Sequence, residues 1–324
     1  MTSAIAIKKR FTKVNIEISN ICNLQCSFCP EVIRPKKRMT EDLFTRVIQE
    51  VAPFTNEVAF HLMGDPLTHP DLDRFLEVTH AHGLRVFLVT NGVLLREKQA
   101  QALLHPALKQ VSFSLHSFHD NFGADRDPTP YLERIFTYTE NAFRARPDLY
   151  INYRLWNLQT TEVTGATYSS EASKRDANEQ MLARIFERFG LSLTEFHARK
   201  TDIRIRKGYP IQNRLSLHFD TEFTWPSLDL PLIGTQGTCK GLSTHIGILA
   251  DGTVVPCCLD KEAAIPLGRI PEQPLTAILD SARAQRILDG FRRGQLQEDL
   301  CQRCQYIERF QKKGPSIRSN SIQT

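Results

Sequence analysis

Eight cysteines carry the clearest chemical signal in this 324-residue sequence. They fall in three groups, and none lies between residues 30 and 238. Thiols scattered through an apolar core are not expected in C-x-x-x-C-x-x-C and C-x-x-C patterns, so the spacing favours ligands of a metal or a redox centre. The eight are Cys22, Cys26, Cys29, Cys239, Cys257, Cys258, Cys301 and Cys304.

The first group, Cys22, Cys26 and Cys29, places three thiolates on one short segment. Three thiolates can hold three irons of a cubane cluster and leave the fourth iron without a protein ligand. Such an open site permits chemistry at the metal. From this spacing alone, a zinc site or a simple electron-transfer centre is the alternative.

The second set of ligands, Cys239, Cys257, Cys301 and Cys304, contains enough thiolates to close a site. Zinc and iron–sulfur clusters both accept four thiolates, and spacing separates them poorly. Cys258 is left over, as a buried thiol or as a substitute ligand for its neighbour.

The elements that position the first cysteines alternate between strand and helix patterns. Thr40 is the expected N-cap of a helix that runs to about Val51. About six β-α units should form a parallel sheet covered by helices, curled into a partial TIM-like barrel whose chemistry lies at the C-terminal ends of the strands. The expected strands are 14–19, 57–62, 84–90, 110–115, 150–156 and 193–197, and the expected helices are 40–51, 71–82, 96–104, 131–145 and 171–189.

The last third of the chain breaks this rhythm. We interpret 200–236 as a bridge between a barrel in residues 1–199 and a small domain in 237–324. In that domain, 244–250 and 253–256 should form a β-hairpin with a two-residue turn, followed by one helix over 275–293. A unit this small needs the stabilisation that a metal centre provides.

The composition is that of an ordinary globular protein, with 41% apolar and 24% charged residues and a net charge of +5. It excludes a disordered or fibrous chain. No apolar run approaches the length of a membrane span, and no signal core is present, so we expect a cytoplasmic protein with free thiols.

The run Cys22-Asn-Leu-Gln-Cys26-Ser-Phe28-Cys29 resembles the radical S-adenosylmethionine (AdoMet) superfamily. The resemblance spans residues 14–198. It implies a [4Fe–4S] cluster whose open iron chelates AdoMet, and a 5′-deoxyadenosyl radical that abstracts a hydrogen atom from the substrate. A reductant such as flavodoxin or ferredoxin is implied as a partner.

Motifs at the following strand ends are similar to the superfamily's AdoMet-binding positions. Met63-Gly64-Asp65-Pro66 stands in place of GGEP, Thr90-Asn91-Gly92 in place of TNG, and Arg154 in place of the arginine that pairs with the AdoMet carboxylate. His116 is expected to be structural, with a substrate contact as the alternative. The implied cofactor contacts are Phe28, Gly64, Asp65, Pro66, Thr90, Asn91, Ser112, Ser114 and Arg154.

The C-terminal cysteine frame resembles twitch, a shortened SPASM domain that binds an auxiliary cluster. The resemblance implies a second [4Fe–4S] cluster held by Cys239, Cys257, Cys301 and Cys304, with a zinc knuckle as the alternative. In related epimerases, a thiol such as that of Cys258 donates a hydrogen atom to the substrate radical. A cysteine without a catalytic role is the other interpretation.

The leading hypothesis is therefore an oxidoreductase that acts on a peptide or small molecule and passes the second electron to the auxiliary cluster. Alternatives are a redox-neutral epimerase that uses Cys258, and an RNA-modifying enzyme suggested by the basic residues at 34–38 and 199–214. An iron–sulfur electron carrier or zinc-binding protein is the non-enzyme alternative.

Overall fold

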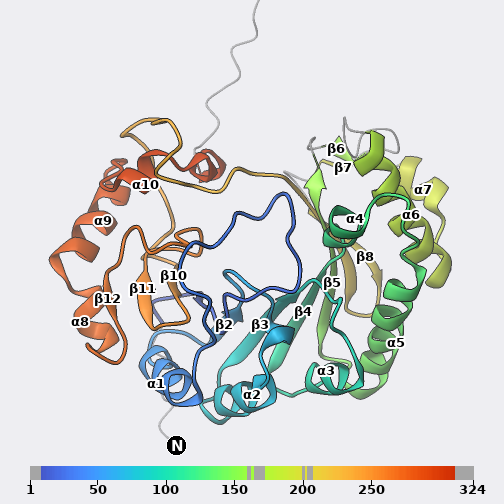
Figure 1. Cartoon of the computed structure of the whole chain (residues 1–324), viewed down its shortest axis with the longest axis horizontal. Coiled ribbons are helices and arrows are strands. Elements are labelled where there is room, and N and C mark those ends of the chain that lie inside the picture. The colour runs from blue at the N-terminus through green and yellow to red at the C-terminus, as the bar shows by residue number, and fades with distance from the viewer. Residues whose placement is uncertain (1–8, 159–161, 164–171, 199–200, 203–206, 311–324) are drawn as a thin grey trace, which may run out of the picture.

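The computed structural model describes residues 9–158, 162–163, 172–198, 201–202 and 207–310. Its centre is a ten-stranded sheet in the order β12-β11-β10-β1-β2-β3-β4-β5-β9-β8. The sheet curves, and helices line its outer side (Figure 1). The predicted α/β fold with a partial TIM-type barrel is confirmed.

The first five strands pair in parallel, each with the next along the chain. This arrangement agrees with the predicted alternation up to residue 158. The strands are β1 (Lys13–Ile16), β2 (Glu57–Phe60), β3 (Arg85–Thr90), β4 (Leu108–Ser114) and β5 (Tyr150–Leu158).

The helices between these strands form where the sequence predicts them, except for a short helix at Ser117–Phe122 that was not predicted. The hydroxyl of Thr40 accepts a hydrogen bond from the Leu43 amide at 3.4 Å and caps the first helix. The helices are α1 (Glu41–Val51), α2 (Leu72–Ala81), α3 (Glu97–Ala102), α4 (Ser117–Phe122), α5 (Thr129–Ala145) and α6 (Ala172–Arg188), with a 3₁₀ turn η1 at Pro66–Thr68.

The sixth parallel strand is not where it was predicted. Residues 193–197, expected as a strand, lie instead in helix α7 (Leu193–Ala198). The sixth parallel strand is β9 (Leu215–Thr221), which pairs with β5 on the side away from β4. It lies within the segment interpreted as a bridge. β8 (Gly208–Gln212) pairs antiparallel with β9. β6 (Glu162–Val163) and β7 (Thr201–Asp202) form a separate two-stranded sheet.

Successive side chains of the barrel strands point to opposite faces of the sheet. On β5, Ile151, Tyr153 and Leu155 are buried among the apolar residues of the core. Asn152 and Arg154 instead line a cavity of about 550 Å³. The barrel therefore has an apolar outer layer, and its interior face presents polar side chains among apolar and aromatic ones.

The C-terminal region adds its hairpin to the same sheet. β10 (His245–Ile248) pairs in parallel with β1, on the side away from β2. β11 (Thr253–Val255) and β12 (Gly268–Arg269) follow in antiparallel order. Figure 1 shows these orange strands beside the first blue and cyan strands.

The hairpin turn differs from the prediction because it has three residues, 250–252, instead of two. The Leu249 amide donates to the Thr253 carbonyl at 2.9 Å and closes the turn. Gly252 has φ +88°, and a Cβ there would lie 2.1 Å from the Ile270 carbonyl oxygen. This position therefore requires glycine.

The single helix expected over 275–293 is two helices, α8 (Leu275–Leu279) and α9 (Ala282–Arg292). The Ser281 hydroxyl accepts a hydrogen bond from the Ala284 amide at 3.3 Å, which caps α9 and separates the two. Two short elements complete this region: α10 (Asp299–Gln302) and the 3₁₀ helix η2 (Gln305–Phe310).

Within the described residues, no helix combines the length and the hydropathy needed to cross a membrane.

Candidate active site and iron–sulfur centres

The three cysteines of the first group lie in the loop after β1 and face the cavity. All three thiols are free. Partial burial raises the pKa of Cys22 to about 11 and that of Cys29 to about 12. The Asn121 amide donates to Cys26 Sγ at 3.1 Å. Because such thiols stay protonated at neutral pH, their thiolates form when a metal displaces the proton, as at a cluster site.

Because Gly64 has no side chain, the loop after β2 can pack closely against the backbone of the loop that carries these cysteines. It has φ +73°, and a Cβ would lie 2.3 Å from the Ser19 carbonyl oxygen. The Asp65 amide and the Thr68 hydroxyl each donate to the Ile21 carbonyl at 3.0 Å. The backbone of the Gly64 motif is thereby held beside the first cysteine group.

Asp65 joins the predicted cofactor motifs to one another. It is buried, and its carboxylate accepts hydrogen bonds from the Leu67 amide at 2.9 Å, the Thr90 hydroxyl at 2.9 Å and the Asn91 amide at 2.7 Å. Burial raises the pKa of Asp65, and these three donors oppose that shift. Asp65, which stands where the superfamily motif has the longer glutamate, thus connects the end of β2 to the end of β3.

Arg154 is a cation in the cavity wall that forms no ion pair within the described residues. Its guanidinium carbon lies 3.2 Å from the centroid of the Trp156 ring, and its Nε is buried without a hydrogen-bond partner among the described residues. Burial lowers its pKa to about 9, so it stays charged at neutral pH. Ser114 lies opposite it on β4, and Ser112 lines the same wall. The site thus offers one guanidinium to an anionic group.

Phe28 and His116 form one face of the cavity, with ring centroids 4.8 Å apart. His116 is buried, and its Nδ1–H donates to the Arg154 carbonyl at 3.1 Å. Burial lowers the pKa of His116 to about 4. A neutral imidazole with a backbone partner agrees with the structural role expected for His116.

The second set of cysteines lines the same cavity as the first. Burial raises the pKa of Cys257 and Cys301, and neighbouring thiols raise both pKa values further, because the sulfurs lie within electrostatic reach of one another. The described residues hold no group of three or more His, Cys, Asp or Glu side chains gathered around a single-ion position. Four thiols on one cavity are the number of ligands that a [4Fe–4S] cluster takes, one thiolate per iron.

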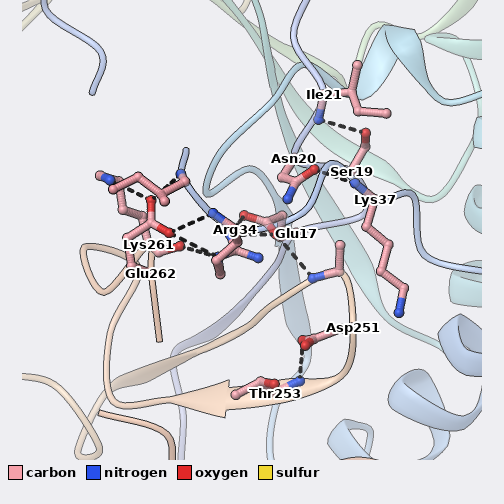
Figure 2. A network of polar contacts seen from close by, with 12 residues as sticks. Glu17, Ser19, Asn20, Ile21, Arg34, Lys37, Asp251, Thr253, Lys261 and Glu262 are labelled. Atoms are coloured by element: carbon pink, nitrogen blue, oxygen red, sulfur yellow. Dashed lines mark hydrogen bonds and ion pairs between the residues drawn. The ribbon is translucent and has the colours of Figure 1, made fainter. Parts of the chain in front are cut away.

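A buried ion-pair network connects the first cysteine loop to the C-terminal hairpin (Figure 2). The Arg34 guanidinium donates to both carboxylate oxygens of Glu17, at 2.9 and 3.0 Å, and Glu17 also accepts from the Ala250 amide at 3.1 Å. The Glu262 carboxylate accepts from the Arg34 amide at 3.1 Å, and Lys261 Nζ donates to Glu262 at 2.7 Å. Loop, β1 and hairpin are thus bonded together.

This network engages one end of the basic run at 34–38, whereas Lys36, Lys37 and Arg38 are exposed, so the RNA alternative stays a prediction. The Arg34 side chain is only 15% exposed and pairs with Glu17, which is fully buried. The Lys37 ammonium points away from the network in Figure 2. In the second basic run, Arg199, Arg204 and Arg206 lie outside the described residues. Arg34, the basic residue of the first run that is nearest to the cysteines in the sequence, is therefore internal.

Sequence reasoning missed the network and much of the cavity lining. Lys13, His61, His218 and His245 all face the cavity. Glu17, a lone acid between Ile16 and Ile18, and the alternation along each strand were the available signals. Neither signal identifies the partners of Glu17, which come from the loop after β1 and from the segment after the neighbouring strand β10.

The geometry defines an enzyme whose cavity is suited to AdoMet and iron–sulfur clusters. Residues 16–161 match the model of the radical SAM superfamily, and residues 239–305 match that of an iron–sulfur cluster-binding domain, SPASM. The chain belongs to this superfamily and carries a C-terminal SPASM domain. Its cofactors are [4Fe–4S] clusters and AdoMet.

The relatives differ in their substrates. An S-adenosyl-L-methionine-dependent 2-deoxy-scyllo-inosamine dehydrogenase of Niallia circulans is 26% identical over 141 residues, 39% of this chain and 56% of that protein. The match thus spans about half of the relative. BtrN in complex with AdoMet and 2-DOIA has a TM-score of 0.54 at 17% identity, covering 92% of this chain and 94% of BtrN.

A second similar structure is Streptococcus suis SuiB bound to the precursor peptide SuiA. Its TM-score is 0.56 at 15% identity, covering 94% of this chain and 74% of SuiB. At these identities the likeness to both structures establishes the fold alone.

We expect Arg34→Met to destabilise the protein by about 3 kcal/mol, because it leaves the Glu17 carboxylate buried without its counter-ion. Urea unfolding of the anaerobically prepared holoenzyme measures the change. The matched control is Arg38→Met, which removes an exposed arginine from the same loop and should change stability by less than about 0.5 kcal/mol. Equal unfolding midpoints for the two variants would contradict a stabilising network.

Proposed function

We propose that this enzyme is an oxidoreductase that removes a carbon-bound hydrogen from a peptide or small molecule and delivers the second electron to an auxiliary cluster. The observation that carries the proposal is that both cysteine sets face one cavity of about 550 Å³. A substrate in this cavity would lie within reach of both an electron source and an electron acceptor.

Cys22, Cys26 and Cys29 would hold the first [4Fe–4S] cluster, and Cys239, Cys257, Cys301 and Cys304 would hold the auxiliary one. When bound, these groups and AdoMet supply a 5′-deoxyadenosyl radical that takes one hydrogen atom and an oxidant that takes one electron. The protein's part is to orient the substrate and exclude water.

The chain's own residues suit that part. Gly64, Asp65 and Pro66 present a fixed backbone edge beside the first cysteines, and Thr90 and Asn91 are held to it by the Asp65 carboxylate. Aromatic side chains close the wall near the second set, among them Phe223, Trp225, Tyr306 and Phe310. His218 also lines the cavity, and burial and nearby cations lower its pKa to about 4, so its imidazole adds no charge there at pH 7.

A redox-neutral epimerase is the second candidate, and Cys258 is the observation in its favour. Cys258 also lines the cavity, and burial raises the pKa of its thiol to about 11. An S–H bond is therefore present at neutral pH. Four other cysteines suffice for the auxiliary cluster, which leaves this thiol available as a hydrogen donor.

Product mass separates the two candidates. Reconstituted enzyme, AdoMet and dithionite are incubated with extracts from cells grown in heavy water, so that the true substrate transfers deuterium to 5′-deoxyadenosine. Oxidation predicts a product that has lost two hydrogens, AdoMet consumed stoichiometrically, and turnover retained in Cys258→Ala. An isomer that gains one solvent hydrogen, together with loss of turnover in Cys258→Ala, would overturn the oxidative proposal.

We further propose that Arg154 pairs with the AdoMet carboxylate. Arg154→Met should weaken AdoMet binding by about tenfold or more, because a charged hydrogen bond is lost, while iron content stays the same. Isothermal titration of the oxidised holoenzyme measures the affinity. Arg214→Met is the control, since Arg214 also stacks on an aromatic ring, at 4.6 Å from Tyr150, but does not line the cavity. Equal affinities would remove Arg154 from the cofactor site.

A further inference from the structure

Lys13 is a cation in the cavity wall that neither the clusters nor AdoMet accounts for. It is the first residue of β1, and its neighbours Val14 and Ile16 are buried on the outer face while Lys13 faces inward. Its ammonium lies 4.2 Å from the centroid of the Phe87 ring. Within the described residues, the ammonium has no hydrogen bond or ion pair. Burial lowers the pKa of Lys13, and the charge of Glu57 opposes that shift. The wall therefore carries a cation that lies against an aromatic face and forms no ion pair within the described residues.

The acids that could neutralise Lys13 are engaged elsewhere. Glu57 on β2 pairs with the Lys109 ammonium, which lies over the same Phe87 ring at 5.2 Å. Asp65 lines the cavity, but its oxygens accept hydrogen bonds from Thr90 and backbone amides. Glu222, the other acid of the lining, is not among the charges that act on Lys13.

Two imidazoles accompany the ammonium. His245 is the β10 residue in register with Lys13, and His61 follows β2. Burial lowers the pKa of His61 to about 3, and the charges of Lys13 and Arg154 lower it further. Burial, then Lys13, also lowers the pKa of His245. Both rings are neutral at pH 7, so each can offer an N–H donor without adding charge.

We propose that Lys13, flanked by His61 and His245, anchors a carboxylate of the substrate within the cavity. One ammonium balances one negative charge, and neutral imidazole N–H groups can bond a second oxygen, which suits a monoanion better than a phosphate dianion. The inference rests on the proposed function, because the anchored molecule is the one that loses hydrogen. It narrows the substrate to an acid, such as a carboxylated small molecule or a peptide with a free carboxylate.

The test measures anion binding without turnover. Trifluoroacetate and fluorophosphate are titrated into the oxidised, AdoMet-saturated holoenzyme, and ¹⁹F line broadening reports binding of a carboxylate and of a phosphate. The carboxylate probe should bind the unmodified chain and be displaced by acetate. Lys13→Met should weaken it by about tenfold or more, and Lys13→Arg should retain it.

Lys98→Met is the matched control, since Lys98 is an exposed lysine of α3 that does not line the cavity, and its removal leaves the Glu57–Lys109 pair intact. Equal carboxylate binding by Lys13→Met and the unmodified chain would overturn the proposal, and so would tighter binding of fluorophosphate. If Lys13→Met does not fold, crystals of the unmodified chain soaked in bromide decide the matter: an anomalous peak beside Lys13 supports an anion site, and none there refutes it. Because no product is measured, failure here is distinct from failure of the oxidative proposal.

Discussion

The parallel pairing of β10 with β1 is the constraint on which the rest of the structure depends. Four consecutive residues of each strand are in register, from Lys13 opposite His245 to Ile16 opposite Ile248. The Glu17 amide extends the ladder by donating to the Ile248 carbonyl at 2.8 Å. Because the loop after β1 carries one cysteine set and the segment after β11 carries part of the other, this one pairing places both on the same cavity.

The interior of the barrel places a few charged groups among apolar and aromatic side chains, and these charges are stabilised in two ways. Where rigidity is needed, charges are bonded: Asp65 holds two strand ends together, and Arg34 and Glu17 fasten the cysteine loop to the hairpin. Burial raises the pKa of Glu17 even beside Arg34, so this carboxylate depends on its partners. Arg154 and Lys13, which face the cavity, lie instead on aromatic rings. Charges left without acid partners are the ones a ligand can satisfy.

Local patterns in the sequence were sufficient to predict most of the strands and helices of the barrel. Alternating apolar positions predicted β1 to β5, and Thr40 marked the start of α1. Leu193–Ala198 was misassigned because apolar residues three apart fit one helical turn as well as a short strand. β9 was missed because its alternation, Leu215-Ser-Leu-His-Phe219, follows a basic stretch that suggested a linker. The break at Ser281 is a cap inside an apolar pattern that is otherwise helical.

The functional site also combines features that local sequence predicts with features that depend on long-range contacts. Cysteine spacing and strand-end motifs are local, so they could be found from the sequence. The roles of Lys13, Glu17 and Arg34 depend on strands and loops more than 200 residues apart in the chain, such as β1 and β10. No local pattern states which strand lies beside which, and the domain boundaries drawn from the sequence stay a prediction.

The central claim is that each cysteine set holds its own [4Fe–4S] cluster beside one shared cavity. Metal and sulfide analysis with Mössbauer spectroscopy tests it on ⁵⁷Fe-reconstituted protein, on Cys22→Ala/Cys26→Ala/Cys29→Ala and on Cys301→Ala/Cys304→Ala. We predict about eight irons in the unmodified chain and about four in each variant, all with cubane parameters, and AdoMet cleavage abolished in the first variant. Four irons with one zinc in the unmodified chain, the zinc lost from Cys301→Ala/Cys304→Ala, would contradict the account.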